Sequence, residues 1–162
     1  GMLSGMINAL AVKDIFESEG IDARCLSTIF AEQVVDSYSA RVAENHLEKG
    51  HVVLLAGGMS RPFFTHDSAA VTFGLEMGCD VVLKSTKVEG IFDKDPAKHE
   101  DAEMFETSSY QRAIEDQDIK VMDKAALGIA MDQHIPVIVF NLAKEGNALK
   151  AASGKKIGTL VS

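Results

Sequence analysis

The sequence is poor in the residues that mark a disulfide-rich or a nucleic-acid-binding protein. Its 162 residues include two cysteines, three prolines and no tryptophan. Lys and Arg number 16 against 24 Asp and Glu, which gives a formal net charge of −8. Because binding to nucleic-acid phosphates requires a basic surface, this charge argues against DNA or RNA as a partner. A small nucleotide, which needs only a few local donors, remains compatible with it.

The cysteines and the hydropathy of the sequence indicate the compartment in which the protein is expected to work. Cys25 and Cys79 are isolated in apolar surroundings, and no histidine stands at metal-ligand spacing from them. We therefore expect buried, reduced thiols, with no disulfide and no protein-held metal. No apolar run approaches the roughly 20 residues of a membrane span, and no signal-peptide pattern is present. These features predict a cytoplasmic protein without a membrane partner, folded as a single domain over residues 1–162.

Strands are expected to alternate with helices along the chain. The apolar runs at 51–56, 80–84 and 136–141 are typical of strands buried on both faces of a parallel sheet. Alternation with helical patterns predicts βαβ units, and thus an α/β fold with a mainly parallel sheet. The other expected elements are helices over 2–19, 33–49, 68–78, 109–117, 123–134 and 147–153, strands over 22–28 and 156–161, and a strand or hairpin arm over 88–92.

Two polar loops within residues 57–96 each follow a predicted buried strand. Gly57 and Gly58 let the backbone turn tightly, and Thr65 and Asp67 can cap the helix that follows. Ligands of open α/β sheets bind outside the carboxyl ends of the strands, and a helix N-terminus there suits phosphate. Neither a P-loop nor a GxGxxG pattern is present, so phosphate would have to be bound in another way.

Several side chains in these loops could serve phosphoryl transfer, and each has a structural alternative. Asp67 could hold a lysine or a magnesium ion, or could only cap the helix. Lys84 ends a buried strand, where its ammonium could neutralise phosphate charge, and Lys87 is its alternative. Phe63 and Phe64 could both pack in the core, or one could flank a nucleobase.

The remaining polar candidates carry weaker signals. Asp93 and Asp95 precede a proline, so they could form a turn and nothing more. His66 stands beside Asp67, but without a paired serine or cysteine the two are poor evidence for hydrolysis. The other histidines are expected to face solvent without partners; they are His46, His51, His99 and His134.

At this point several segments resemble the bacterial uridylate kinases, the UMP kinases of the amino-acid-kinase superfamily. They are PFFTHDSAA at 62–70, DVVLKSTKVEGIFDKDP at 80–96, KVMD at 120–123, IPVIVFN at 135–141, GTL at 158–160, and GMLSGMINALAVKD at 1–14, which resembles a mid-chain helix of that family. The resemblance covers essentially the whole chain and corresponds to the C-terminal two-thirds of the family. It implies a three-layer αβα sandwich that lacks its N-terminal strands and forms a hexamer. It also implies transfer of the ATP γ-phosphate to UMP with Mg²⁺, a step of pyrimidine nucleotide biosynthesis.

The resemblance also implies roles for individual residues. Asp67 would organise the catalytic site, with Lys84 as the cation argued above. The residues that would contact ATP are Thr86, Phe92 and Asp95. Those that would line UMP are Met59, Ser60, Arg61, Pro62, Phe63, Phe64, Thr65 and His66.

The sequence departs from the family at two levels. The family loop usually reads TGNPFFTTD; here Met59, Ser60 and Arg61 replace Thr, Gly and Asn, and His66 replaces the second Thr. The KxSGE strand and the GGGN loop, which cradle phosphates in the family, do not occur in these 162 residues. We therefore expect these residues alone not to catalyse at family rates. The alternatives are a non-catalytic nucleotide-binding remnant, or a sister kinase acting on a carboxylate or carbamate.

Overall fold

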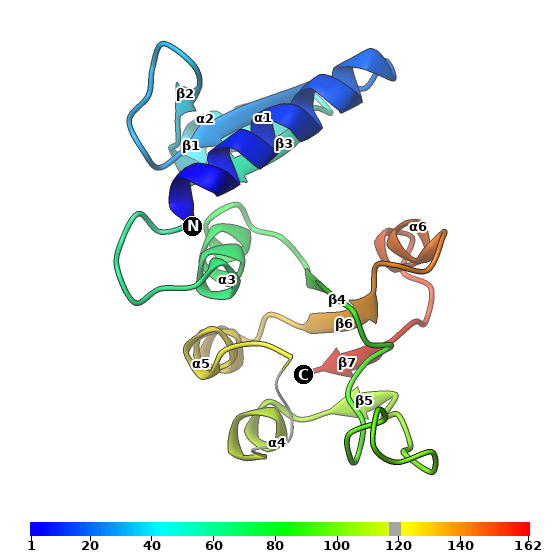
Figure 1. Ribbon diagram of the computed structural model, residues 1–162. Coiled ribbons are helices and arrows are strands. Elements are labelled where there is room, and N and C mark those ends of the chain that lie inside the picture. Colours follow the sequence, from blue (N-terminus) through cyan, green and yellow to red (C-terminus); the bar gives the residue numbers. More distant parts are fainter. Residues whose placement is uncertain (117–120) are drawn as a thin grey trace. The chain divides into compact units, whose positions relative to one another are not determined.

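The computed structural model describes residues 1–116 and 121–162 (Figure 1). Contacts within the chain divide it into two compact units, Gly1–Ala69 and Ala70–Ser162. Each unit combines helices with a sheet, and among the described strands every pairing is parallel except that between β6 and β7. The predicted α/β class with a mainly parallel sheet is therefore confirmed. Among the described residues, no helix combines the length and the apolar character needed to cross a bilayer.

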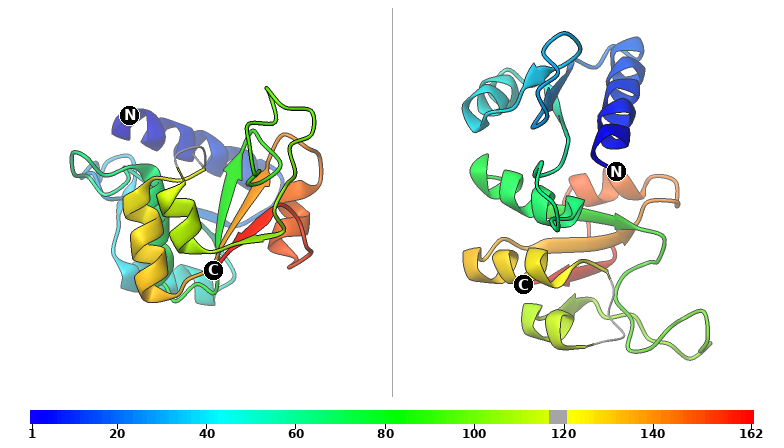
Figure 2. Two further views of the ribbon diagram at one scale, coloured as in Figure 1. Left: turned by 90° about the horizontal axis from the view of Figure 1, so that it is seen from below. Right: turned by 60° about the vertical axis from the view of Figure 1, so that its left-hand side comes forward.

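The first unit is a three-stranded parallel sheet with helices packed against it. Its elements are α1 (Met2–Ser18), β1 (Ala23–Ser27), β2 (Asp36–Ser37), α2 (Ala40–Glu48) and β3 (Val52–Ala56). The strand order is β2-β1-β3, and Cys25 pairs in register with Leu54. Helices lie on both sides of these strands (Figure 2, right). Met6 of α1 packs with Cys25, Val35 and Ala56 to form the core of the unit.

The second unit has a four-stranded sheet in the order β4-β6-β7-β5. Its strands are β4 (Val82–Thr86), β5 (Thr107–Ser108), β6 (Val137–Asn141) and β7 (Thr159–Val161). Its helices are α4 (Tyr110–Glu115), α5 (Lys124–Gln133) and α6 (Asn147–Ala152), while α3 (His66–Glu76) crosses the boundary between the units. Helices α4 and α5 cover one side of this sheet and α6 lies on the other (Figure 2, left). The core is aliphatic, and Leu127, Val137, Val139 and Val161 are almost fully buried in it.

Most of the predicted helices begin and end close to the observed bounds. Ser109 accepts a hydrogen bond from the backbone N–H of Arg112, and Asp123 accepts one from Ala126. Helix α5 ends at Gln133, and its C-cap residue His134 takes a left-handed conformation. The final residue of the predicted helix 109–117 and the first of the KVMD segment lie outside the described residues.

The helix predicted over residues 33–49 is wrong in its first half. Helix α2 begins only at Ala40, and Ser39 is its N-cap, accepting a hydrogen bond from the backbone N–H of Val42. Before it, Asp36 pairs with Leu26 to form the short strand β2. The apolar spacing suggested a longer helix. The pairing of Asp36 with β1 and the cap at Ser39 override that spacing. Residues 88–92 also form no strand; only an isolated bridge joins Phe92 to Met104.

Burial differs from the sequence prediction in the strands and at one cysteine. Strand β6 is buried as expected, but Val52 of β3 and Leu83 of β4 are exposed. These two strands stand at the ends of their sheets' strand orders, which leaves side-chain surface open. Both cysteines are free thiols; Cys25 is buried, whereas Cys79 is exposed, contrary to expectation. Burial raises the pKa of the Cys25 thiol.

Two histidines also differ from expectation. His46 and His51 were expected to lack partners, yet their rings stack with centroids 5.3 Å apart. Their Nδ1 atoms lie 3.2 Å apart, within hydrogen-bond distance. Desolvation lowers the pKa of His46, with a smaller contribution from His51. His99 and His134 are exposed, as predicted.

Candidate active site

The loop after β3 carries most of the residues that sequence reasoning selected. Its backbone has positive φ at Gly57 (87°), Gly58 (59°), Ser60 (51°) and Phe63 (71°). A Cβ at Gly57 would lie 2.5 Å from Oγ1 of Thr28, so only glycine fits at this turn. The chain therefore folds back sharply at the carboxyl end of β3, which is where ligands of open α/β sheets bind.

Thr28, which follows β1, anchors this loop. Its hydroxyl donates to the carbonyl of Gly58 at 2.9 Å and lies 3.3 Å from the carbonyl of Ala56. The Ser60 hydroxyl donates to Oγ1 of Thr28 at 2.6 Å. Thr28 was not singled out from the sequence, because these bonds join positions about thirty residues apart, and no local pattern marks them.

The same loop ends by capping α3. Oγ1 of Thr65 accepts hydrogen bonds from the backbone N–H groups of Asp67, at 3.0 Å, and Ser68, at 3.3 Å. Asp67 lies in the first turn of the helix and is half-buried, while Ser68 is buried. The predicted capping role of Thr65 is thus confirmed, and the carboxylate of Asp67 lies at a helix N-terminus that follows a strand-end loop.

The two phenylalanines of this loop are not in the core. Phe63 is fully exposed and Phe64 is 52% exposed, so the alternative in which both pack inside is wrong. The exposed ring of Phe63 buries no apolar surface, and its left-handed backbone is unfavourable for a bulky residue. Because exposed apolar surface often marks an interaction site, Phe63 is a candidate for ligand contact. The ring of His66 instead lies close to Gly58 and Gly5, since its Nε2 is 3.4 Å from where a Cβ on Gly5 would stand.

A cavity of about 670 Å³ opens beside this loop in the first unit. The residues that line it include Thr28, Phe30, Met59, Ser60 and Arg61. The structure therefore brings three predicted acceptor residues together at one cavity, with Arg61 as the cation in its wall. Phe30, which is 85% exposed, was not selected from the sequence.

The second group of predicted residues follows β4 in the second unit. Lys84 is half-buried and lies two positions before the end of β4, which extends to Thr86 rather than stopping at the lysine. The Thr86 hydroxyl donates to the carbonyl of Val88 at 2.7 Å and accepts from its N–H at 3.2 Å. Thr86 thus shapes the turn that leaves the strand, and Phe92 lies half-buried farther along the same loop.

Asp93 and Asp95, which follow Phe92, form a turn, as the structural alternative for them predicted. Asp95 accepts a hydrogen bond from the N–H of Ala97 and pairs with Lys98 at 3.2 Å. These contacts, the N–H of Ala97 foremost, lower the pKa of Asp95. Asp93 accepts from the N–H of Glu103 at 2.8 Å. Both carboxylates hold the turn in shape, and Asp95 is exposed.

A polar cluster that the sequence did not reveal lies where β4 and β6 end. Lys144 pairs with Glu89 at 3.0 Å, and the Asn141 amide donates to the same carboxylate at 2.9 Å. These two contacts, Lys144 first, lower the pKa of Glu89. The Asn147 amide donates to the carbonyl of Asn141 at 2.9 Å. The only sequence signal was the asparagine that ends the apolar run of β6.

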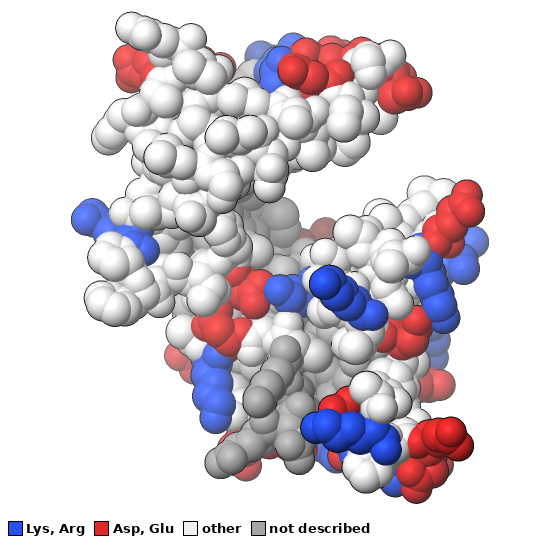
Figure 3. All heavy atoms as spheres, in the orientation of Figure 1, with Lys and Arg blue, Asp and Glu red and all other residues white. Residues whose placement is uncertain are grey.

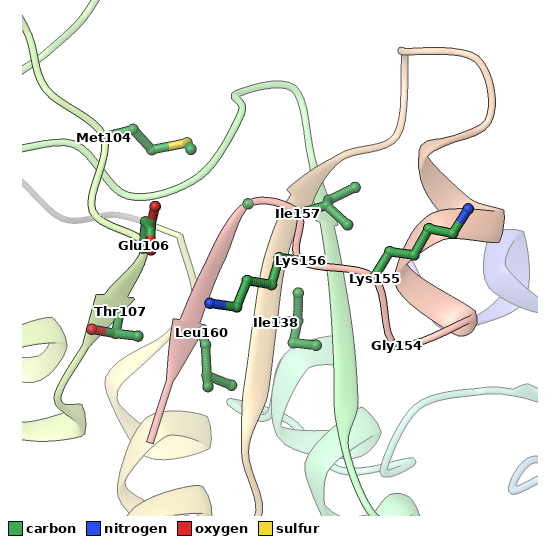
Figure 4. A pocket seen from close by; sticks show the side chains of 10 residues that line it. Met104, Glu106, Thr107, Ile138, Gly154, Lys155, Lys156, Ile157 and Leu160 are labelled. Atoms are coloured by element: carbon green, nitrogen blue, oxygen red, sulfur yellow. The ribbon is translucent and has the colours of Figure 1, made fainter.

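Another cavity of the second unit has a separate set of lining residues. It measures about 330 Å³ and opens on strands β5, β6 and β7 (Figure 4). Ile138 and Leu160 form its apolar floor, and Met104 and Lys156 line it. No residue predicted to bind a nucleotide lines this cavity. On the face drawn in Figure 3, lysine and arginine side chains of the second unit are interspersed with acidic ones.

These features define an α/β protein whose polar loops lie at the carboxyl ends of parallel strands. The model of the amino acid kinase family matches residues 1–141, and the chain belongs to that family. A uridylate kinase from Helicobacter hepaticus is 46% identical over 156 residues, which are 96% of this chain and 66% of the relative. The chain thus spans slightly less than two thirds of the length of this curated relative.

Solved structures agree with this assignment. The chain matches a UMP kinase from Bacillus anthracis with a TM-score of 0.94 and 32% identity, over 100% of this chain and 67% of that one. It matches a UMP kinase from Ureaplasma parvum with a TM-score of 0.92 and 30% identity, over 100% of this chain and 69% of that one. The resemblance to the bacterial uridylate kinases, drawn from short segments, is therefore confirmed.

Proposed function

We propose that the protein carrying this chain is an ATP-dependent UMP kinase, which transfers the γ-phosphate of ATP to UMP and releases UDP and ADP. The observation that carries the proposal is the loop from Gly57 to Thr65. It leaves β3 in a strained turn, borders a cavity and caps α3 in a chain whose relatives bear the name uridylate kinase. The activity belongs to pyrimidine nucleotide biosynthesis, and we place it in the cytoplasm.

The acceptor would bind along the first loop. Arg61 offers a cation beside the cavity, and exposed Phe63 and Phe64 offer apolar faces for a base. Thr65 and His66 continue the acceptor loop into the N-terminus of α3, whose dipole favours an anion. The complete set of proposed acceptor residues is Met59, Ser60, Arg61, Pro62, Phe63, Phe64, Thr65 and His66.

The donor would bind along the second loop. Thr86, Phe92 and Asp95 are the proposed ATP contacts, and all three lie on the segment that leaves β4. Lys84 is the proposed cation for the charge that spreads over the transferring phosphoryl group. Asp67 is the proposed carboxylate that organises the catalytic centre. Positioning and charge neutralisation by these side chains supply most of the expected catalysis, because phosphoryl transfer needs little covalent chemistry from the protein.

Magnesium fits this site as an ion that arrives with ATP. Among residues 1–116 and 121–162, no group of three His, Cys, Asp or Glu side chains could hold a metal ion. Mg²⁺ in phosphoryl transfer is usually bound by one or two carboxylates together with substrate phosphates and water. Asp67 is the proposed protein carboxylate, and the ion would neutralise phosphate charge. By resemblance we also propose a hexamer.

An acceptor panel tests the proposal. The protein at its natural length is supplied with ATP and Mg²⁺ and with UMP, CMP, AMP, acetate or carbamate, and the formation of ADP is followed. We expect turnover with UMP at about 1–100 per second and far slower turnover with the others. Preference for a carboxylate or carbamate would instead identify a sister kinase. Binding of UMP and ATP without turnover would identify a non-catalytic nucleotide-binding protein.

A further inference from the structure

The acceptor loop, residues 57–66, takes a strained backbone conformation at Ser60. Ser60 has a φ of 51°, a left-handed conformation that disfavours any residue with a Cβ. Glycine would carry no such penalty at this position. Serine therefore needs a compensating contact to keep the turn.

Thr28 supplies that contact. Its Oγ1 accepts the hydrogen bond from the Ser60 hydroxyl at 2.6 Å while its own hydroxyl donates to the carbonyl of Gly58 at 2.9 Å. The same oxygen stands so close to Gly57 that a side chain there would collide with it. One threonine thus contacts three positions of the turn, and it is half-buried, where such bonds are less weakened by water.

We propose that Thr28 is a positioning residue for the nucleoside monophosphate acceptor, and that it acts through Ser60. The two neighbours of Ser60 are Met59 and Arg61, and all three border the 670 Å³ cavity together with Thr28. Fixing the φ of Ser60 fixes where the Arg61 side chain leaves the backbone. This inference rests on the proposed function, because it takes the loop to be the acceptor site.

The contacts of Thr28 stay on the side of the acceptor loop. The hydrogen bonds of Thr28 run to Ala56, Gly58 and Ser60, all in the first unit. The proposed donor residues Thr86 and Phe92 belong to the second unit. Loss of the Thr28 hydroxyl should therefore raise the KM for the acceptor and leave the KM for ATP unchanged.

The experiment compares four variants of the protein at its natural length. Thr28→Val removes the hydroxyl but keeps the shape, and Thr28→Ser keeps the hydroxyl. Ser60→Gly removes the need for compensation, and the double variant combines Thr28→Val with Ser60→Gly. The KM for UMP, the KM for ATP and kcat are measured for each, together with the midpoint of thermal unfolding.

We expect Thr28→Val to raise the KM for UMP by at least about threefold, because the hydrogen bonds of the hydroxyl with Gly58 and Ser60 are both lost. Thr28→Ser should stay close to the parent protein. In the Ser60→Gly background, Thr28→Val should raise the KM for UMP by clearly less than it does in the parent protein, because the two hydroxyls are bonded to each other and glycine adopts the turn unaided. An unchanged KM for UMP in Thr28→Val would overturn the proposal. So would equal changes in both KM values with a lowered unfolding midpoint, since that pattern indicates a general structural role.

A second measurement tests the role of Thr28 without relying on UMP kinase activity. Amide hydrogen exchange at Gly58, Ser60 and Arg61 is measured in the parent protein and in Thr28→Val. Faster exchange confined to these amides supports the positioning role, and unchanged exchange overturns it. If the parent protein did not phosphorylate UMP, the proposed function would fail, and exchange would still decide whether Thr28 holds the loop.

Discussion

Thr159, near the C-terminus of the second unit, binds the backbone of Ile91 by a hydrogen bond. Its Oγ1 accepts a hydrogen bond from the Ile91 N–H at 2.8 Å and donates to the carbonyl of Phe105 at 2.6 Å. Thr159 is fully buried and Ile91 almost so. One hydroxyl on β7 therefore fixes both ends of the loop that carries Phe92 and Asp95, two of the proposed ATP contacts.

Replacing Thr159 with valine should destabilise the second unit. The buried N–H of Ile91 would lose its partner, and an unsatisfied buried donor lowers the free energy of unfolding by about 1–3 kcal/mol. Urea unfolding of Thr159→Val and of Thr159→Ser, which keeps the hydroxyl, measures this. Equal stability of the valine variant and the parent protein would show that the loop does not depend on this bond.

The assignment of the catalytic cation can be tested with two lysines on the same segment. Lys84 is half-buried in β4, whereas Lys87 is exposed just beyond it. We expect Lys84→Met to lower kcat about a hundredfold or more, the usual effect of losing one group that stabilises transition-state charge. Lys87→Met should stay within about threefold of the parent protein. If the larger loss occurred in Lys87→Met instead, the roles of the two lysines would have to be exchanged.

Phe63 should contribute to binding and not to stability. Its side chain is fully exposed and its φ is 71°. Because a left-handed conformation disfavours residues with a Cβ by roughly 1–2 kcal/mol, Phe63→Gly should raise the free energy of unfolding by up to about that amount. The same variant should weaken UMP binding, which isothermal titration calorimetry measures. Lower stability with unchanged binding would indicate that the ring packs against protein and does not contact the acceptor.

Acidic pH should weaken the first unit through His46. Desolvation, and to a lesser degree His51, lowers the pKa of His46 in the folded protein. Between the folded and the unfolded pKa, the unfolded chain binds more protons, so stability falls as pH drops below about 6.5 and levels off below the folded pKa. An NMR titration of the histidine ring signals checks the direction. His51→Ala should raise the pKa of His46 only in part, because burial is the larger cause, and a pKa of His46 above the free value would contradict the account.

Local signals in the sequence were sufficient for much of this fold. Caps such as Ser109 and Asp123 act within three residues of themselves, so the helices that they open could be predicted. The helix expected over 33–49 failed because Asp36 pairs with Leu26, a contact that apolar spacing does not encode.

For the candidate site, local sequence signals located the two loops but not the contacts that hold them. The loops at 57–66 and 84–95 were identified from strand ends, glycines and a family resemblance. These signals lie within each loop, so neighbouring residues were sufficient to find them. The bond between Thr28 and Ser60 and the ion pair between Glu89 and Lys144 join distant positions. Such pairs become visible only when the folded chain brings the residues together.

We expect UMP to bind the loop after β3 and ATP to bind the loop after β4. NMR chemical-shift mapping on the protein at its natural length tests this most directly, with UMP and a non-hydrolysable ATP analogue added in turn. The account predicts that UMP shifts the amide signals of residues 57–67, and that the analogue shifts those of residues 84–95. Shifts by UMP at the cavity of β5, β6 and β7, with residues 57–67 unaffected, would contradict it.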